Sequence, residues 1–118
     1  MCNTIKTISK VKSGELSICL QCNIYRLEFN NIYLEFEQKE FEQFKTYILD
    51  LEMGYWEQRY ASTKLKRKIP IPSMQHNLVL MFKQEEINEL KTLVLNISDD
   101  IYTTLLNIKD IDYTLILN

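Results

Sequence analysis

Two stretches of the sequence decide the fold that we predict: IYLEFEQKEFEQFKTYIL at residues 32–49 and LVLMFKQEEINELKTLVL at residues 78–95. Aligned at an offset of 46, they share seven identical residues among 18 positions. Each begins with alternating apolar residues, the period of a half-buried strand, and continues with apolar residues three and four apart, the period of an amphipathic helix. A pattern shared at two different periods indicates an internal repeat of one strand-to-helix unit.

A further strand is expected before each of these stretches. In the first copy, residues 24–29 lead into Asn30 and Asn31, and asparagine tolerates the positive φ that a tight hairpin turn requires. In the second copy, residues 68–72 (KIPIP) take this place and are followed by a longer loop. Each copy is therefore predicted to be a strand, a second strand and a helix.

The two prolines of the second copy predict which side of their strand can pair. Residues two apart in a strand direct their backbone N–H groups to the same side, so Pro70 and Pro72 remove two donors from one side only. The other side remains free to pair with residues 78–82. We therefore predict an edge strand that is protected against further pairing.

The predicted fold class is α+β, with two ββα repeats forming one antiparallel sheet, helices packed on one face, and a C-terminal helix. All 118 residues form one domain, with the repeats at about residues 19–52 and 65–98. Residues 16–19 are expected to add a strand in front. Residues 99–118 are predicted to form the C-terminal helix and a β-prone tail, with Ser98 as the helix N-cap.

Composition excludes several classes of protein. No run of 18 apolar residues is present, so no transmembrane helix is predicted, and the first fifteen residues lack the apolar core of a secretory signal. Only two glycines occur, and neither lies in a phosphate-binding loop. The net charge of -2 provides no general attraction to nucleic acid or anionic membranes. We expect a cytoplasmic protein whose cysteines are thiols.

The motif Cys19-Leu20-Gln21-Cys22-Asn23 is the sharpest local feature. It lies between two expected strands, and Asn23 in a left-handed conformation would close a metal-binding turn. Zinc requires four ligands: Cys2 and the single histidine, His76, could complete the site, or two subunits could each donate one pair of cysteines. A redox pair is favoured less, because a strand follows the motif where redox motifs of this type precede a helix. We favour structural thiols, with no cofactor; zinc is the alternative.

A second feature interleaves aromatic residues with positive charge, as in a surface on which single-stranded nucleic acid stacks. The candidate contacts in this region are Trp56, Arg59, Lys66, Arg67 and Lys68. The alternative interpretation is a continued helix with core aromatics, followed by a solvated basic linker. Because the sequence pI is near 5.4 and no nucleic-acid motif is present, we favour this alternative.

No group of residues in the sequence indicates catalysis, so we predict a protein that is not an enzyme. His76 stands alone in an expected loop, and a catalytic triad would need a nucleophile and an orienting acid held beside it in space, which the sequence does not show. The strand at residues 78–82 is apolar on both faces, and Val79 and Met81 lie on the face opposite Leu80. An uncovered apolar face usually marks an interface. We therefore expect a protein–protein interaction or structural module, in the simplest case a homodimer; the alternative is a zinc-stabilised nucleic-acid-binding regulator.

Parts of the sequence resemble a small uncharacterised bacterial domain family. The matching residues are Cys19 and Cys22, Tyr25-x-Leu27-x-Phe29-Asn30-Asn31, Phe41, Phe44, Tyr55-Trp56, residues 68–72 and residues 86–90. The resemblance covers roughly residues 16–95. It implies a bacterial cytosolic protein and brings no activity and no site residue with it.

Overall fold

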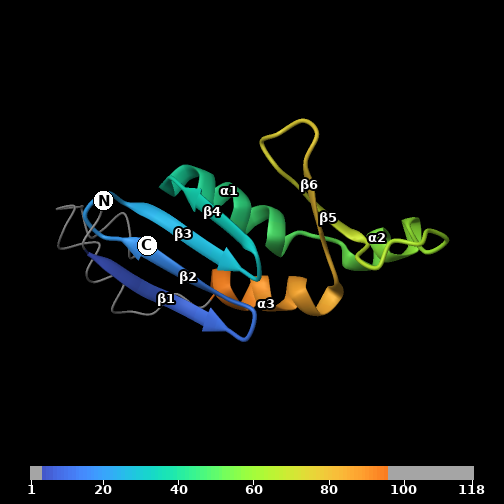
Figure 1. Cartoon of the computed structure of the whole chain (residues 1–118), viewed down its shortest axis with the longest axis horizontal. Helices are drawn as coiled ribbons and strands as arrows, with labels where there is room; N and C mark the ends of the chain where they lie inside the picture. Colours follow the sequence, from blue (N-terminus) through green and yellow to red (C-terminus); the bar gives the residue numbers. More distant parts are fainter. Residues whose placement is uncertain (1–3, 96–118) are drawn as a thin grey trace.

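The computed structural model describes residues 4–95, which form six strands and three helices (Figure 1). In chain order these are β1 (Ile5–Val11), β2 (Gly14–Cys19), β3 (Ile24–Phe29), β4 (Ile32–Phe36), α1 (Gln38–Leu49), α2 (Met53–Arg59), β5 (Ile69–Pro72), β6 (Val79–Phe82) and α3 (Gln84–Leu95). The predicted α+β class is confirmed.

The first four strands form an antiparallel sheet in the order β1-β2-β3-β4. The β3–β4 hairpin turns at Asn30-Asn31, as predicted, and Asn30 adopts the positive φ, at 53°. At the start of β2, Gly14 lies so close to β3 that an added Cβ would sit 2.1 Å from the carbonyl oxygen of Glu28. A glycine is therefore required there for the two strands to pair.

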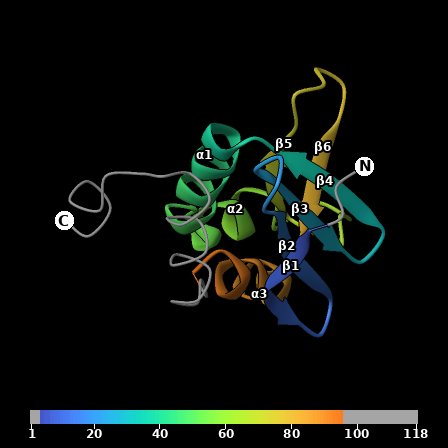
Figure 2. The ribbon, with the colours of Figure 1, turned by 90° about the vertical axis from the view of Figure 1, so that its left-hand side faces the viewer.

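The two long helices cover one face of this sheet (Figure 2). Helix α1 contacts β3 and β4, and α3 contacts β1 and β2. The buried hydroxyl of Ser9 in β1 donates to the carbonyl oxygen of Leu93, at 2.7 Å. Glu89 of α3 accepts bonds from both the backbone N–H and the hydroxyl of Ser13, in the β1–β2 turn. The space between the layers is filled by fully buried side chains: Leu16, Ile18, Leu27, Phe29, Ile48, Ile87, Leu90, Leu93 and Val94.

Strands β5 and β6 form a separate two-stranded antiparallel sheet, which we call the ribbon. Its cross-strand pairs are Ile69–Phe82, Pro70–Met81, Ile71–Leu80 and Pro72–Val79. The inner face of the ribbon is buried in the core through Ile69, Ile71 and Phe82. The hydroxyl of Tyr47 in α1 donates to the carbonyl oxygen of Pro70, at 3.0 Å.

The structure divides the strands between two sheets, where we had predicted one. The pairing of the proline-containing strand with residues 78–82 is confirmed, but this hairpin does not join the larger sheet. On the side where Pro70 and Pro72 lack N–H groups, β5 faces α1 and α2 instead of another strand. Strand β1 was not predicted. The predicted helix and tail at residues 99–118 lie outside the described residues.

The order strand, strand, helix nevertheless occurs twice, as β3-β4-α1 and β5-β6-α3. Both helices have 12 residues and begin 46 positions apart, at Gln38 and Gln84. Their first turns are closed by the same bond. Glu40 accepts from the N–H of Glu37 at 2.8 Å, and Glu86 accepts from the N–H of Lys83 at 2.7 Å.

Candidate functional site

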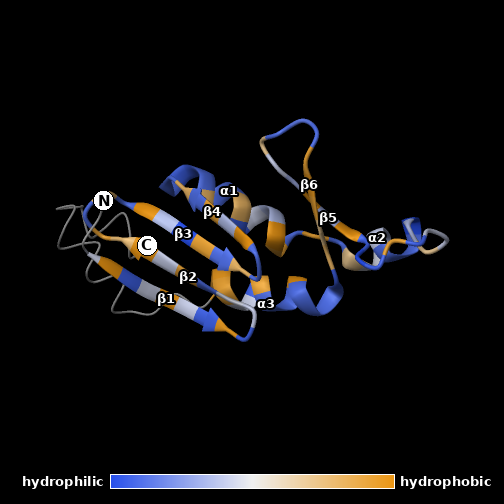
Figure 3. Cartoon of the chain, viewed as in Figure 1, coloured by the Kyte–Doolittle hydropathy of each residue, from blue (hydrophilic) through white to orange (hydrophobic). Residues whose placement is uncertain are grey.

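The outer face of the ribbon is apolar and partly open to solvent: Pro72 and Val79 are exposed, and Pro70 and Met81 are half-buried. It is formed by the side chains opposite to the buried ones, those of Pro70, Pro72, Val79 and Met81. Val79 is 49% exposed. The adjoining loop adds Leu78 and Met74, which are 48% and 94% exposed. Figure 3 shows the hydrophobic colouring of β6. The predicted interface residues, Val79 and Met81, therefore lie on one continuous apolar surface.

The backbone of β6 is also open on one side. Because prolines cannot donate an N–H, the hydrogen-bonded pairs of the ribbon are Ile69–Phe82 and Ile71–Leu80. The N–H and C=O groups of Val79 and Met81 then point away from β5. Among the described residues, no strand other than β5 lies beside β6. Strand β6 is thus a free edge that carries no charged side chain.

The β3–β4 hairpin provides a comparison within the same chain. Leu34 of β4 corresponds to Leu80 of β6, because each is paired with a buried residue of the preceding strand. The position that holds Met81 in the ribbon holds Glu35 in β4. Glu35 forms an ion pair with Arg26 at 3.7 Å and accepts a bond from the hydroxyl of Tyr33 at 2.8 Å. The outer face of the β3–β4 hairpin is therefore polar, and that of the ribbon is not.

A mostly apolar pocket of about 390 Å³ lies between β4, α1 and the ribbon. Its apolar lining comes from all three parts of the structure: Leu34 and Phe36, Phe44 and Tyr47, and Ile71, Pro72, Met74 and Leu80. The pocket adjoins the exposed loop of the ribbon through Met74.

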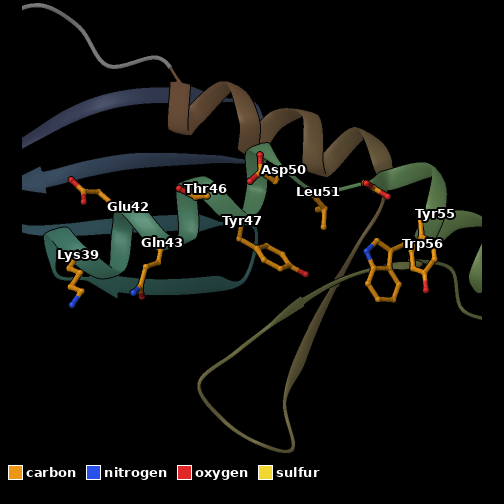
Figure 4. Close-up of a pocket in the computed structure, with 10 residues that line it drawn as sticks. Lys39, Glu42, Gln43, Thr46, Tyr47, Asp50, Leu51, Tyr55 and Trp56 are labelled. Carbon is orange, nitrogen blue, oxygen red and sulfur yellow. The ribbon is translucent and has the colours of Figure 1, made fainter. Parts of the chain in front are cut away.

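A wider groove of about 850 Å³ follows the solvent side of α1 to α2 (Figure 4). Figure 4 shows Tyr47, Leu51 and Trp56 on the same side of the connection between the two helices. Charged and amide side chains of α1 form the rest of the lining, among them Lys39, Glu42 and Gln43. No pattern in the sequence had indicated this groove, because its lining residues come from two helices that pack through tertiary contacts.

The Cys19-x-x-Cys22 motif forms a closed turn between β2 and β3. The N–H of Asn23 donates to the carbonyl oxygen of Cys19 at 2.8 Å, and Asn23 adopts a φ of 57°. The predicted left-handed conformation of Asn23 is confirmed. Cys19 is buried and Cys22 is exposed. The structure differs from the predicted thiols, because Cys19 and Cys22 are both disulfide-bonded.

The other candidate metal ligands are not gathered around this turn. Within residues 4–95, no group of three or more histidine, cysteine, aspartate or glutamate residues could hold a metal ion. His76 is exposed in the loop of the ribbon, which lies beyond the end of the larger sheet opposite the β2–β3 turn (Figure 1). Cys2 lies outside the described residues. The structure therefore does not bring His76 together with the two cysteines.

Most of the predicted nucleic-acid contacts interact with other groups of the chain. Arg59 lies 5.9 Å from the centre of the Trp56 ring and donates to the hydroxyl of Tyr55. The ammonium group of Lys68 donates to the carbonyl oxygen of Leu65. Lys66 is exposed. These contacts lie within the chain, and binding of nucleic acid by these residues stays a prediction.

Arg67 belongs to a junction centred on Glu86 of α3. Its Nε and Nη2 donate to the two oxygens of the Glu86 carboxylate, at 2.8 and 3.1 Å. Asn30, in the β3–β4 turn, donates to the same carboxylate at 3.4 Å. Burial acts to raise the pKa of Glu86, but the bonds from Arg67 and from the N–H of Lys83 outweigh it and lower the pKa below 4.5. This junction was not predicted; its one signal in the sequence is the acidic residue at the third position of the helix.

The chain matches one known protein family over its whole length. The model of a family of unknown function, DUF6686, matches residues 1–118. The chain belongs to the DUF6686 family. The predicted likeness to an uncharacterised family is confirmed, and the match extends over the whole DUF6686 chain rather than residues 16–95 alone.

No curated protein and no solved structure matches this member of the DUF6686 family. The helices of the described residues are all too short or too polar to cross a membrane.

Proposed function

We propose that the chain is a non-enzymatic interaction module that forms a homodimer through the free edge of β6. The observation that carries this proposal is the coincidence of two features on the same two residues. Strand β6 presents unpaired backbone groups at Val79 and Met81, and the side chains of these residues lie on the apolar outer face of the ribbon, where Val79 is exposed and Met81 is half-buried. Edges of this kind pair readily with a further strand.

A second copy of the chain is the simplest occupant of this edge. If two β6 strands lie antiparallel about a two-fold axis, Leu80 faces its own copy, and Val79 faces the partner's Met81. The backbone groups of Val79 and Met81 are then in register to exchange bonds, and the two ribbons form one four-stranded sheet. The outer faces of both ribbons become continuous and are partly covered from solvent.

The differences between the two hairpins support β6 as the pairing strand. The edge of β4 carries the charge of Glu35, which hinders pairing with another strand. The backbone edge of β5 that faces away from β6 carries Pro70 and Pro72, and the carbonyl oxygen of Pro70 already accepts a bond from Tyr47. Of these three edges, β6 is the one with neither a charge nor a proline.

We also infer that β3-β4-α1 and β5-β6-α3 arose by duplication of one unit. The seven identities, the equal helix lengths and the shared capping bond at Glu40 and Glu86 support this inference. After the duplication, the second copy acquired the apolar outer face that the first copy lacks. The formation of a contact between two chains at this face explains the change.

The experiment is a proline substitution at Met81, measured by sedimentation over a range of protein concentrations. Met81→Pro places a proline directly opposite Pro70 and removes one N–H from the free edge, without removing a bond of the β5–β6 ladder. The matched control is Glu35→Pro, at the corresponding position of β4. We expect the wild-type chain and Glu35→Pro to dimerise and Met81→Pro to remain monomeric.

Thermal unfolding of each variant establishes that it is folded. A wild-type chain that stays monomeric at every concentration would overturn the proposal. A folded Met81→Pro variant that dimerises as the wild type does would also overturn it.

A further inference from the structure

The pocket between β4, α1 and the ribbon is an unfilled part of the apolar interior. Its walls carry large apolar side chains that pack against the core and are only half-buried: Leu34, Phe36, Phe44 and Leu80. Side chains that face an open space lose the dispersion contacts that close packing provides elsewhere in a core. The volume of about 390 Å³ is within the range of small-molecule binding sites. A small apolar ligand in this space would restore the missing contacts.

The walls of the pocket are fixed by hydrogen bonds within the chain. The hydroxyl of Tyr47 donates to the carbonyl oxygen of Pro70 at 3.0 Å and joins α1 to the ribbon. In the ribbon loop, the hydroxyl of Ser73 donates to the carbonyl oxygen of Leu78 at 2.6 Å. Tyr47 and Ser73 both line the pocket. Because these bonds need no ligand, the pocket is already formed in the free protein, as most small-molecule sites are.

Met74 is suited to cover a ligand in this pocket. It is part of the lining, yet 94% of its surface is exposed to solvent. A methionine side chain has three rotatable bonds and a polarisable sulfur, so it adapts to apolar surfaces of irregular shape. Since it is almost fully exposed, Met74 can move over an apolar ligand without breaking contacts in the core.

The charged part of the lining is acidic. It consists of Glu35 and Glu40, and no described lysine or arginine lines the pocket. Glu35 is paired with Arg26 at 3.7 Å. Glu40 accepts the capping bond from the N–H of Glu37 and has no ion-pair partner among the described residues. Its carboxylate would attract a cationic group of a ligand and repel a carboxylate.

We propose that this pocket binds a small amphipathic amine. The apolar body of the ligand lies among Leu34, Phe44 and Leu80, and its ammonium group lies beside the carboxylate of Glu40. Met74 packs over the apolar body. All of these residues belong to one chain, so the inference goes beyond the proposed dimer and does not depend on it.

The test is a calorimetric titration of the full chain at pH 7 with three probes that carry the same alkyl chain: octylamine, octanol and octanoate. At this pH the amine is a cation, as a lysine side chain is. We expect octylamine to bind most tightly and octanoate about 2- to 30-fold more weakly, because an exposed carboxylate attracts one and repels the other. Octanol should lie between them. A wild-type chain that does not bind octylamine would overturn the proposal, and so would equal affinities for octylamine and octanoate.

Two substitutions test the location of the apolar body. Leu34→Phe adds ring atoms inside the pocket and should weaken octylamine binding by about 10-fold or more. Thermal unfolding shows whether this variant is folded. Met74→Ala removes only exposed atoms and should weaken binding by about 3- to 10-fold. Gln75→Ala, in the same loop and exposed, is its matched control and should bind as the wild type does. Wild-type affinity in Met74→Ala or in folded Leu34→Phe would overturn this location.

Glu40→Gln tests the position of the ammonium group. It removes the charge and keeps an oxygen that can accept the capping bond from Glu37. We expect the affinity for octylamine to fall by about 1.5- to 5-fold and the affinity for octanol to stay unchanged. Glu42→Gln is the matched control, because Glu42 is exposed on the same helix and lines the wider groove instead. Equal effects of the two variants on octylamine binding would overturn the role of Glu40.

Discussion

Glu86 joins three parts of the described chain through one carboxylate. It accepts bonds from Arg67, before β5, from Asn30, in the β3–β4 turn, and from the N–H of Lys83, at the start of its own helix. Since the pKa of Glu86 is lowered in the folded protein, its ionised form stabilises the fold above the ordinary value of 4.5. This contribution is lost as the pH falls through the folded pKa.

We therefore predict that Glu86→Gln lowers the free energy of unfolding at pH 7, and that the difference from the wild type closes below about pH 4. Glu40→Gln is the matched control, because Glu40 makes the same capping bond and, among the described residues, has no arginine partner. It should show a smaller difference over the same pH range. Denaturant unfolding at a series of pH values measures both. Equal effects for the two variants would contradict the role of the junction.

Gly14 provides a second prediction at the level of single residues. An added Cβ would lie 2.1 Å from the carbonyl oxygen of Glu28, in backbone that cannot move without breaking the pairing of β2 with β3. Gly14→Ala should destabilise the fold by about 1–3 kcal/mol or more. Gly54→Ala is its control, since no atom lies within 4 Å of the added Cβ. Chemical denaturation of the two variants gives the comparison, and equal stabilities would refute this account of Gly14.

The sequence predicted single residues best where backbone conformation depends on the residue itself. Asn23 and Asn30 both adopt the expected positive φ, because asparagine tolerates that region better than most residues do. The partners of Arg67 and Arg59 could not be predicted. Both interactions depend on how distant segments pack, and local patterns contain no information about that.

Tyr47 links two elements, and its hydroxyl can be removed without changing the packing of its ring. The hydroxyl donates to the carbonyl oxygen of Pro70, on the side of β5 that has no strand partner. Tyr47→Phe should therefore lower the stability by about 0.5–1.5 kcal/mol. The decisive measurement is hydrogen exchange of the ribbon amides, which should become faster than in the wild type. Unchanged exchange and unchanged stability would show that this bond does not hold the ribbon in place.

At the level of elements, the sequence predicted the two hairpin-and-helix segments and missed β1. The period of apolar residues changes clearly from two to about 3.6 after β4 and after β6, and the helices begin there. In β1 the alternation is broken, because the apolar residues Ile5, Ile8 and Val11 are three apart instead of two and the pairing shifts register between Thr7 and Ser9. A bulge of this kind removes the period on which the prediction depends.

The division into two sheets also could not be predicted from periodicity. Alternation shows which side chains share a face, but not which strand edges meet. The prolines correctly indicated an unpaired side of β5. What covers that side, namely α1 through Tyr47 and also α2, depends on tertiary packing.

On the scale of the whole molecule, the proposed dimer depends on how two similar hairpins differ. One is extended by β2 and β1 and has a polar outer face; the other remains a two-stranded ribbon with an apolar outer face. A substitution that gives β6 the charge found in β4, Met81→Glu, should leave the fold intact and abolish dimerisation. Light scattering of this variant and of the wild type measures whether the added charge prevents dimerisation. A dimer that tolerates the charge would show that the contact lies elsewhere.

Hydrogen exchange of the β6 amides at two protein concentrations tests the central claim most directly. The amides of Leu80 and Phe82 pair with β5 and should be protected at both concentrations. The amides of Val79 and Met81 face the free edge, so we predict fast exchange in dilute protein and marked protection in concentrated protein. Exchange at Val79 and Met81 that does not depend on concentration would contradict pairing through β6.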